Sequence, residues 1–247
     1  MIQEFNNLKN KFLHIKNQGW IKSIRKGSTG SGVTFEYLLG LQENNLEIPD
    51  YEGIEIKTKR NYSNSYTTLF NCTPEGPHFR EIERLVNKYG YPDLVLKECK
   101  VINNSIFTNS MTKINSNYYF KLTIDRNSKK VFLNVIDIYG NLIENNVYWT
   151  FETLEEKLYR KLKNLAFIDA TRKVIDKEEY FRYYRLTMYQ LKNFNCFINL
   201  LEQGIIRITF KIGVFRTGSR KGQIHDHGTG FDIKENDLLK LYNLYET

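Results

Sequence analysis

The sequence predicts an α/β (α+β) fold with a mixed central sheet flanked by helices, and three observations support this. Apolar residues recur at helical spacing near the N-terminus, residues 53–58 alternate between apolar and polar, and residues 101–148 combine strong β-formers with turn residues. The length of 247 residues allows one large core or two lobes of modest size. No internal repeat or linker divides the chain.

The N-terminal part of the chain is predicted to hold two helices and a strand. Four apolar residues at helical spacing indicate a first helix that ends near Gly19: Phe5, Leu8, Phe12 and Ile15. A basic, Gly/Ser-rich loop follows at 22–32, and then a short helix at 34–39 with Thr34 near its N-cap. After a turn at 44–49, residues 53–58 form the predicted strand.

The rest of the chain is predicted to alternate between strands and helices. Helical patterns occur at 77–90, at 151–166 and around 186–203, and the residues between the first two read as an antiparallel meander. Residues 205–215 read as a strand that opens a long hairpin, 205–233, reaching out from a core. The last residues, 236–247, are predicted to close as a helix.

Composition narrows the class of protein. The formal charge of +8 favours a polyanionic partner, nucleic acid first and an anionic membrane surface second. The three cysteines, Cys72, Cys99 and Cys196, form no metal-ligand or disulfide pattern. The chain shows no apolar stretch of membrane-spanning length and no signal peptide, so we expect a cytoplasmic protein with no membrane contact.

A cluster of charged residues at 50–57 carries the predicted chemistry. A turn brings Asp50 to the start of the strand, where Glu55 and Lys57 lie on one face and Ile54 and Ile56 on the other. Two carboxylates held close together attract Mg²⁺, and an ammonium beside them can orient a water or neutralise charge during phosphoryl transfer. The alternative interpretation is a solvated strand face, because D-x4-E-x-K alone is a common pattern.

Upstream features favour the catalytic interpretation. Glu36, on the short helix, can support a metal site or hold its waters. The glycine-rich loop before it contains Ser28 and Thr29, and its backbone N–H groups can approach a DNA phosphate.

Three segments also carry a family resemblance: KGSTGSGVTFEYLLG (26–40), PDYEGIEIKTKR (49–60) and HDHGTGF (225–231). They resemble the MutH-like branch of the PD-(D/E)xK nucleases, and most closely its MvaI/BcnI group of Type II restriction endonucleases. The resemblance implies a PD-(D/E)xK core with a second, smaller DNA-recognition lobe, the two forming a cleft. The catalytic lobe would include about residues 1–75, and the recognition elements about 205–233.

The resemblance also implies an activity and a set of site residues. The activity is Mg²⁺-dependent hydrolysis of double-stranded DNA at a short specific site, leaving 5′-phosphate and 3′-hydroxyl ends, with Mn²⁺ expected to substitute. The matching catalytic positions are Glu36, Asp50, Glu55 and Lys57, and the metal-binding positions are Asp50, Glu55 and Ile56. Members of this group act as monomers, so we expect no obligate protein partner.

The segment around HDHG is the candidate for reading bases. His225, Asp226 and His227 offer donors and acceptors suited to base edges, and the resemblance assigns them that role. Two alternatives stay open: a metal site of two histidines and a carboxylate, and structural hydrogen bonding within a turn. Five further residues on or near the preceding strand are candidate DNA contacts, mainly to phosphates: Thr209, Lys211, Arg216, Arg220 and Lys221.

This reader departs from the CCWGG-cutting members of the group. Thr209 and Lys211 stand where those members have Asp and Arg, and Asp232 stands where they have Arg. We therefore do not transfer CCWGG to this chain. Phe215 could wedge against bases or belong to the core. The alternatives to a restriction enzyme are a MutH-like nicking endonuclease of mismatch repair and a non-catalytic DNA-binding protein.

Overall fold

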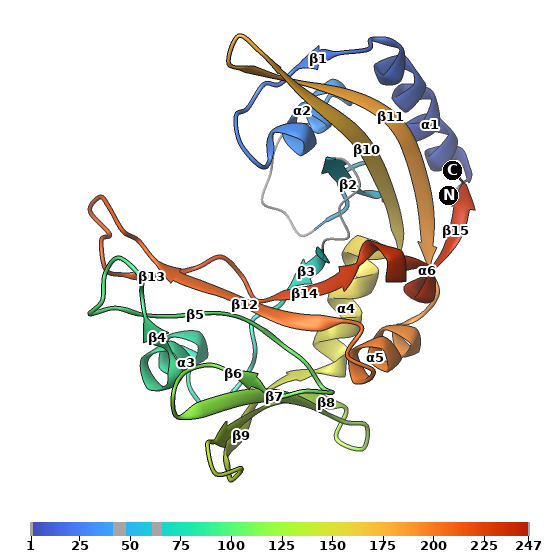
Figure 1. Ribbon diagram of the computed structural model, residues 1–247. Coiled ribbons are helices and arrows are strands. Elements are labelled where there is room, and N and C mark those ends of the chain that lie inside the picture. The colour runs from blue at the N-terminus through green and yellow to red at the C-terminus, as the bar shows by residue number, and fades with distance from the viewer. Residues whose placement is uncertain (1, 42–47, 61–65, 247) are drawn as a thin grey trace. The chain divides into compact units, whose positions relative to one another are not determined.

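The computed structural model describes residues 2–41, 48–60 and 66–246 (Figure 1). The fold is mixed α/β, with three sheets and six α-helices among the described residues, as the sequence predicted. The chain forms two compact units. Unit 1 comprises residues 1–65, 157–192 and 239–247, and unit 2 comprises 66–156 and 193–238.

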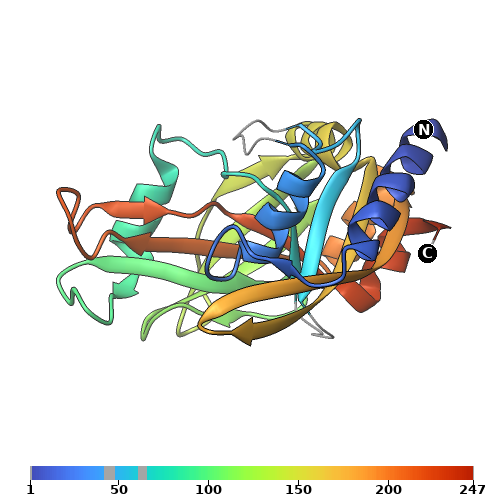
Figure 2. The same ribbon diagram turned by 90° about the horizontal axis from the view of Figure 1, so that it is seen from above.

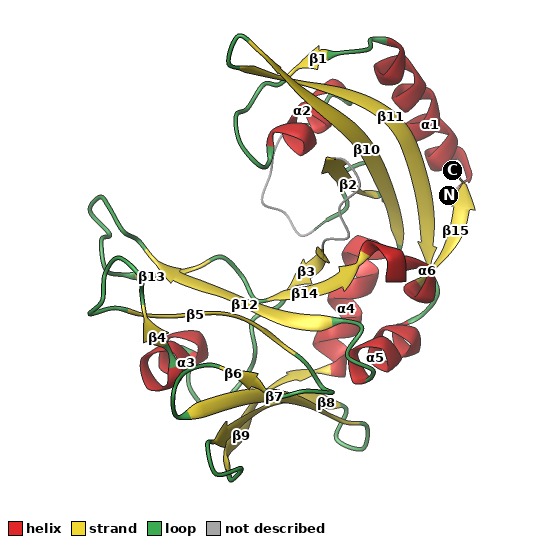
Figure 3. Cartoon of the chain, in the orientation of Figure 1, coloured by secondary structure: helices red, strands yellow, loops and turns green. Residues whose placement is uncertain are grey.

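Unit 1 is built on a mixed sheet in the order β1-β11-β10-β2, with β15 paired to β11 (Figure 3). Its strands are β1 (Ile21–Lys22), β2 (Glu55–Arg60), β10 (Asn164–Ile175), β11 (Glu178–Leu191) and β15 (Tyr242–Glu246). β2 runs parallel to β10, whereas the other pairs are antiparallel. The short strand that carries the charged cluster is therefore an edge of this sheet.

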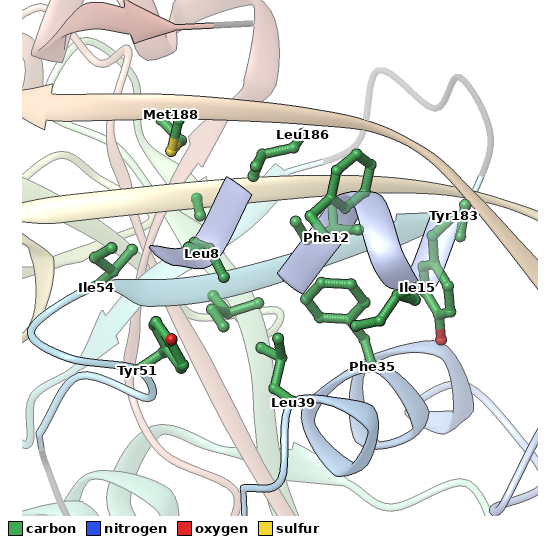
Figure 4. Close-up of a cluster of buried hydrophobic side chains, with 14 of the residues drawn as sticks. Leu8, Phe12, Ile15, Phe35, Leu39, Tyr51, Ile54, Tyr183, Leu186 and Met188 are labelled. Carbon is green, nitrogen blue, oxygen red and sulfur yellow. The ribbon is translucent and has the colours of Figure 1, made fainter. Parts of the chain in front are cut away.

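Two helices supply the apolar core of unit 1. All four residues that predicted the first helix are buried in α1 (Ile2–Asn17), which packs against β11. Phe35 of α2 (Gly30–Leu38) joins the same cluster, together with Ile56 of β2 and Tyr183 of β11 (Figure 4). Figure 2 shows α2 beside β2. The core thus fixes β2, and with it the strand face that carries Glu55.

Unit 2 contains two sheets, one of six strands in the order β3-β14-β12-β5-β4 with β13 on β12, and one of four in the order β6-β7-β8-β9. The six strands are β3 (Tyr66–Asn71), β4 (Tyr91–Pro92), β5 (Lys100–Ile106), β12 (Arg207–Val214), β13 (Ile224–Asp226) and β14 (Gly230–Lys234). The four are β6 (Thr112–Lys113), β7 (Tyr118–Asp125), β8 (Lys130–Asp137) and β9 (Leu142–Thr150).

The remaining helices are α3 (Glu81–Tyr89), α4 (Phe151–Leu162), α5 (Phe194–Glu202), the 3₁₀ turn η1 (Glu235–Asp237) and α6 (Leu238–Leu241). Unit 2 holds the larger share of the chain, whereas we expected the recognition lobe to be the smaller one. The reason is that the meander and the hairpin strands belong to one unit, with Trp149 of β9 packed against Phe210 of β12 and Phe231 of β14. The base of the 205–233 segment is therefore core rather than an outlying hairpin.

Several element bounds differ from the prediction. α2 begins at Gly30, so Thr34 lies buried inside it. The helix predicted at 151–166 ends at Leu162, because the next six core positions form a continuously buried strand, a pattern that periodicity alone does not distinguish from a helix. Residues 186–191 belong to β11. The helix predicted over 236–247 is confirmed only as the short α6 at 238–241, and residues 242–246 form β15.

Two further predictions concern the chain at or near the segments that lie outside the described residues. Residues 66–75, expected in the catalytic lobe, lie in unit 2, where β3 pairs with β14. Most of the turn predicted at 44–49 falls outside the described residues. In the part of the chain that is described, no helix is long and apolar enough to cross a membrane.

Candidate active site and nucleic-acid interface

A tight turn delivers Asp50 to the start of β2. Tyr51 and Ile54 exchange backbone hydrogen bonds of 3.0 and 2.7 Å across the turn, which Gly53 completes with a φ of +82°. The Asp50 Oδ2 atom then accepts a 2.8 Å hydrogen bond from the Ile56 N–H. This turn follows Asp50 and is distinct from the one predicted at 44–49; it lets the Asp50 carboxylate lie against the backbone of the strand that follows.

The two carboxylate oxygens of the buried Glu55 have different surroundings. Its exposed fraction is 1%, and its Oε1 atom lies 2.6 Å from Lys57 Nζ and 3.5 Å from Lys161 Nζ. The Oε2 atom has no hydrogen-bond partner among the described residues. Burial raises the pKa of Glu55, the charge of Lys57 opposes this, and the nearby charge of Asp50 adds to it. The carboxylate therefore lacks a compensating positive charge on its Oε2 side.

A divalent cation fits this deficiency. A buried carboxylate oxygen without a donor is costly, and a hard cation that binds one or two carboxylates would satisfy it. Glu55 Oε2 and the carboxylate of Asp50 are the two protein ligands available. The Ile56 side chain lies in the core, so only its main chain could contribute to the site.

Glu36 does not complete a three-carboxylate cluster. It is half-buried on α2, where a Cβ added to Gly32 would lie 3.7 Å from Glu36 Oε1 and 3.1 Å from Thr58 Oγ1 of β2. Across the described ranges, no three His, Cys, Asp or Glu side chains form a group that could hold a metal ion. The same finding leaves the metal alternative for HDHG without support, since its three side chains do not form such a group.

Lys161 is a member of the cluster that the sequence did not reveal. It lies on the last turn of α4, about a hundred residues beyond Glu55, and β10 then returns to pair in parallel with β2. No local pattern marks one lysine of this Lys-rich helix as different from the others. Only the pairing of β10 with β2 brings its ammonium to Glu55.

The glycine-rich loop leaves its polar residues at the surface. Ser28 and Thr29 are exposed immediately before α2, and Gly30 donates a backbone hydrogen bond to Gly27 O. A Cβ on Gly30 would lie 2.4 Å from Arg25 O, so the close approach of the loop to itself requires glycine there. The N-terminus of α2 is thus presented together with two exposed hydroxyl groups.

In unit 2, a buried carboxylate organises one face of the six-stranded sheet. Asp232 is 3% exposed and accepts 2.7 Å hydrogen bonds from both Thr68 and Thr209. Lys211 Nζ donates to Thr68 Oγ1 at 2.9 Å and lies 3.9 Å from Asp232 Oδ1. The side chain of Thr209 is therefore buried in this network, while Lys211 is held with part of its side chain exposed.

The HDHG segment forms a stack of rings with the end of β12. Phe215 lies parallel to His225 at a centroid distance of 4.0 Å, and His225 lies 3.8 Å from His227. The Arg220 guanidinium lies 3.9 Å from the centroid of the Phe215 ring. Burial, His227 and Arg220 lower the pKa of His225, while Asp226 opposes them. Phe215 is half-buried in this stack and does not belong to the core.

Asp226 forms a structural hydrogen bond within the HDHG turn, as one of the two alternatives for this segment proposed. Its Oδ1 atom accepts a 2.8 Å hydrogen bond from the Gly228 N–H, although the side chain is exposed. Arg216 is likewise engaged, since its Nη2 atom lies 2.8 Å from Asp93 Oδ2 and holds the pKa of Asp93 far below its usual range. Lys221 is exposed.

A cavity of about 470 Å³ lies beside this stack. Its lining includes residues of the neighbouring strands β12, β5 and β4 and of the HDHG segment. The polar and aromatic side chains that line it include Tyr91, Asn103, Lys211, Phe215, His225 and His227. Four of the predicted DNA-contacting residues thus line one concave surface of unit 2, together with residues of the segment at 91–103: Lys211, Arg216, His225 and His227.

Comparisons with known proteins identify the family of this chain and similar solved structures. The family model of the MvaI/BcnI restriction endonuclease family matches residues 9–242. A solved complex of restriction endonuclease MvaI with its cognate DNA substrate is similar at 36% identity and a TM-score of 0.89, covering 99% of this chain and 98% of that one. A structure of MvaI without DNA is similar at 34% identity over the same shares of both chains, with a TM-score of 0.63. No curated protein sequence matches.

Proposed function

The chain belongs to the MvaI/BcnI restriction endonuclease family and is a Type II site-specific deoxyribonuclease with a PD-(D/E)xK-like fold, and we propose that it cuts double-stranded DNA at a short sequence in an Mg²⁺-dependent reaction. The products are 5′-phosphate and 3′-hydroxyl ends, and Mn²⁺ substitutes for Mg²⁺. The observation that carries the proposal is the buried Glu55, which lies near Asp50 and two lysines and whose Oε2 atom has no hydrogen-bond partner among the residues that the structure describes.

Each residue of the cluster has a distinct task in this reaction. Asp50 and Glu55 hold the cation, which when bound withdraws charge from the scissile phosphate. Lys57 orients the attacking water and places a positive charge where the transition state becomes more negative. Glu36 acts from α2 by holding water at the edge of the site rather than as a direct ligand.

The reader of unit 2 selects where that chemistry acts. Similarity to a restriction enzyme bound to its cognate DNA supports a duplex substrate. Base edges are read by three residues: His225, Asp226 and His227. Phosphates are contacted by Arg220 and Lys221, and in unit 1 by Ser28 and Thr29. Thr209 and Arg216 act indirectly, because their side chains are held by Asp232 and Asp93. The protein acts as a monomer without a protein partner.

Incubation with a long duplex, with Mg²⁺ and separately with EDTA, tests this function. Discrete double-strand fragments that form only with Mg²⁺ are the expected result. Nicks confined to one strand at a motif would favour a repair-type endonuclease instead. Binding of the duplex with no cleavage under any divalent cation would overturn the proposed reaction.

A further inference from the structure

We propose that Asn103 of β5 is a further base-reading residue, acting beside Lys211 and recognising an adenine in the major groove. The proposal rests on the proposed function, since it names part of the sequence that the endonuclease selects. Asn103 lies in the segment at 91–103, which the sequence did not connect with DNA.

The register of the sheet places the two side chains together. Asn103 is directly opposite Lys211 in the antiparallel β5–β12 pair, so both side chains leave the sheet on the same face. They also line the same cavity as His225 and His227. Opposed residues in such a pair have Cβ atoms about 5 Å apart, and stacked bases of one strand are spaced by about 3.4 Å. The pair can therefore address neighbouring bases.

Asn103 is held by its backbone while its side chain is available. Its N–H donates a 3.1 Å hydrogen bond to the Tyr91 hydroxyl, but its side-chain amide is exposed and makes no hydrogen bond with the described residues. The next pair inward differs, because Ser105 and Thr209 are hydrogen-bonded to each other at 3.1 Å and Thr209 also donates to Asp232. The inner pair is thus satisfied within the protein, and the outer pair presents its polar groups to the cavity.

The two outer side chains have complementary chemistry. An asparagine amide offers one donor and one acceptor side by side, which matches N7 and N6 of adenine. The Lys211 ammonium is fixed by Thr68, and a Cβ on Gly230 would lie only 2.8 Å from it, so glycine leaves the space that the ammonium occupies. A held ammonium suits the O6 and N7 acceptors of guanine. This face of the sheet therefore presents an adenine reader next to a guanine reader.

Cleavage of duplexes with 7-deazaadenine at single positions tests the proposal. The site is first read from the ends of fragments made by the wild-type enzyme, and each adenine in it is then replaced in turn. At one position kcat/KM of the wild type should fall about 10- to 100-fold, because the N7 acceptor is lost. Asn103→Ala should show a similar loss on the unmodified duplex and no further loss at that position. Asn145→Ala, an exposed asparagine of β9, is the control that should behave as wild type.

The outcomes separate this inference from the function on which it rests. A wild type that cuts no DNA would overturn the proposed function and this inference with it. A recognition site without adenine, or an Asn103→Ala enzyme that stays as sensitive to 7-deazaadenine as the wild type, would overturn the Asn103 assignment alone. Equal loss of Asn103→Ala activity at all sequences would also contradict it, because a structural defect does not depend on the base.

Discussion

The catalytic cluster of unit 1 and the reader of unit 2 treat their buried carboxylates in opposite ways. Asp232 is surrounded by donors, with a hydroxyl on each oxygen and Lys211 nearby. Glu55 is as deeply buried, yet within the described part of the chain one of its oxygens has no hydrogen-bond partner. A satisfied carboxylate fixes the geometry around it, whereas a buried carboxylate oxygen without a donor is a position that a hard cation would satisfy. The network around Asp232 is thus complete within the protein, and the cluster around Glu55 leaves a place for the proposed cation.

Lys57→Ala tests the catalytic role proposed for the cluster of unit 1. Loss of the ammonium that orients water and neutralises charge should slow cleavage on the order of 10³-fold. Single-turnover cleavage at saturating Mg²⁺ measures the loss, and the dissociation constant for the same duplex should change little. Lys163→Ala, an exposed lysine of the same unit, is the control. Cleavage by Lys57→Ala at the wild-type rate would show that the assignment of the active site is wrong.

His225→Ala tests the base-reading role proposed for unit 2 and leaves the catalytic cluster of unit 1 unchanged. Discrimination between cognate and non-cognate duplexes should fall about 10- to 100-fold, since the ring ordered between Phe215 and His227 is lost. Lys221→Ala removes a proposed phosphate contact, so it should weaken the binding of both duplexes alike and reduce the slope of log K against log salt by about one. Titrations at several salt concentrations measure both effects. Equal weakening of both duplexes by His225→Ala would remove its reading role.

Lys161→Ala tests a residue whose place beside Glu55 is shown by the fold and was not predicted from the sequence. One of the two cations at Glu55 Oε1 is removed, so the buried negative charge is less well compensated. We expect cleavage to slow about 10-fold, less than for Lys57, and Lys161→Arg to recover most of it. A fluorescence titration with Mn²⁺ on the DNA-free enzyme gives an independent readout of the same carboxylate. Unchanged cleavage and unchanged Mn²⁺ affinity would exclude Lys161 from the site.

Glu144→Gln tests a satisfied carboxylate of unit 2 that belongs to neither proposed site, so it should affect cleavage least. Burial alone would raise the pKa of Glu144, but hydrogen bonds from Arg84, Tyr89 and Lys88 lower it to about 2. Its stabilisation is therefore present above its ordinary pKa of 4.5 and is lost as pH falls towards 2.

We accordingly expect the variant to be less stable than wild type by about 2 kcal/mol at pH 7. The difference should shrink as pH falls below 4.5. Urea unfolding at a series of pH values measures it, and a difference that does not depend on pH would contradict the assignment.

The same contrast explains how much the sequence could predict. Asp50, Glu55 and Lys57 are close in sequence, and one turn and one strand bring them together, so local patterns were sufficient. The first helix and the meander were predicted for the same reason.

Sites assembled from distant segments were not predictable in this way. The Lys161 contact depends on the parallel pairing of β10 with β2, and β10 was itself taken in part for a helix. Asn103 reaches the reader only through the register of β5 with β12. Sheet pairing over such distances leaves no local signal in a single sequence.

The central claim is that unit 1 cuts and unit 2 chooses where, and sequencing the ends of all fragments tests it most directly. Wild-type enzyme with Mg²⁺ should give ends that share one short motif. Lys57→Ala should give no ends, and His225→Ala should give ends with the same 5′-phosphate chemistry at a wider set of sequences. The contradicting result would be His225→Ala cutting at the wild-type motif alone, or Lys57→Ala cutting at other motifs, because either would place choice and chemistry in the wrong unit.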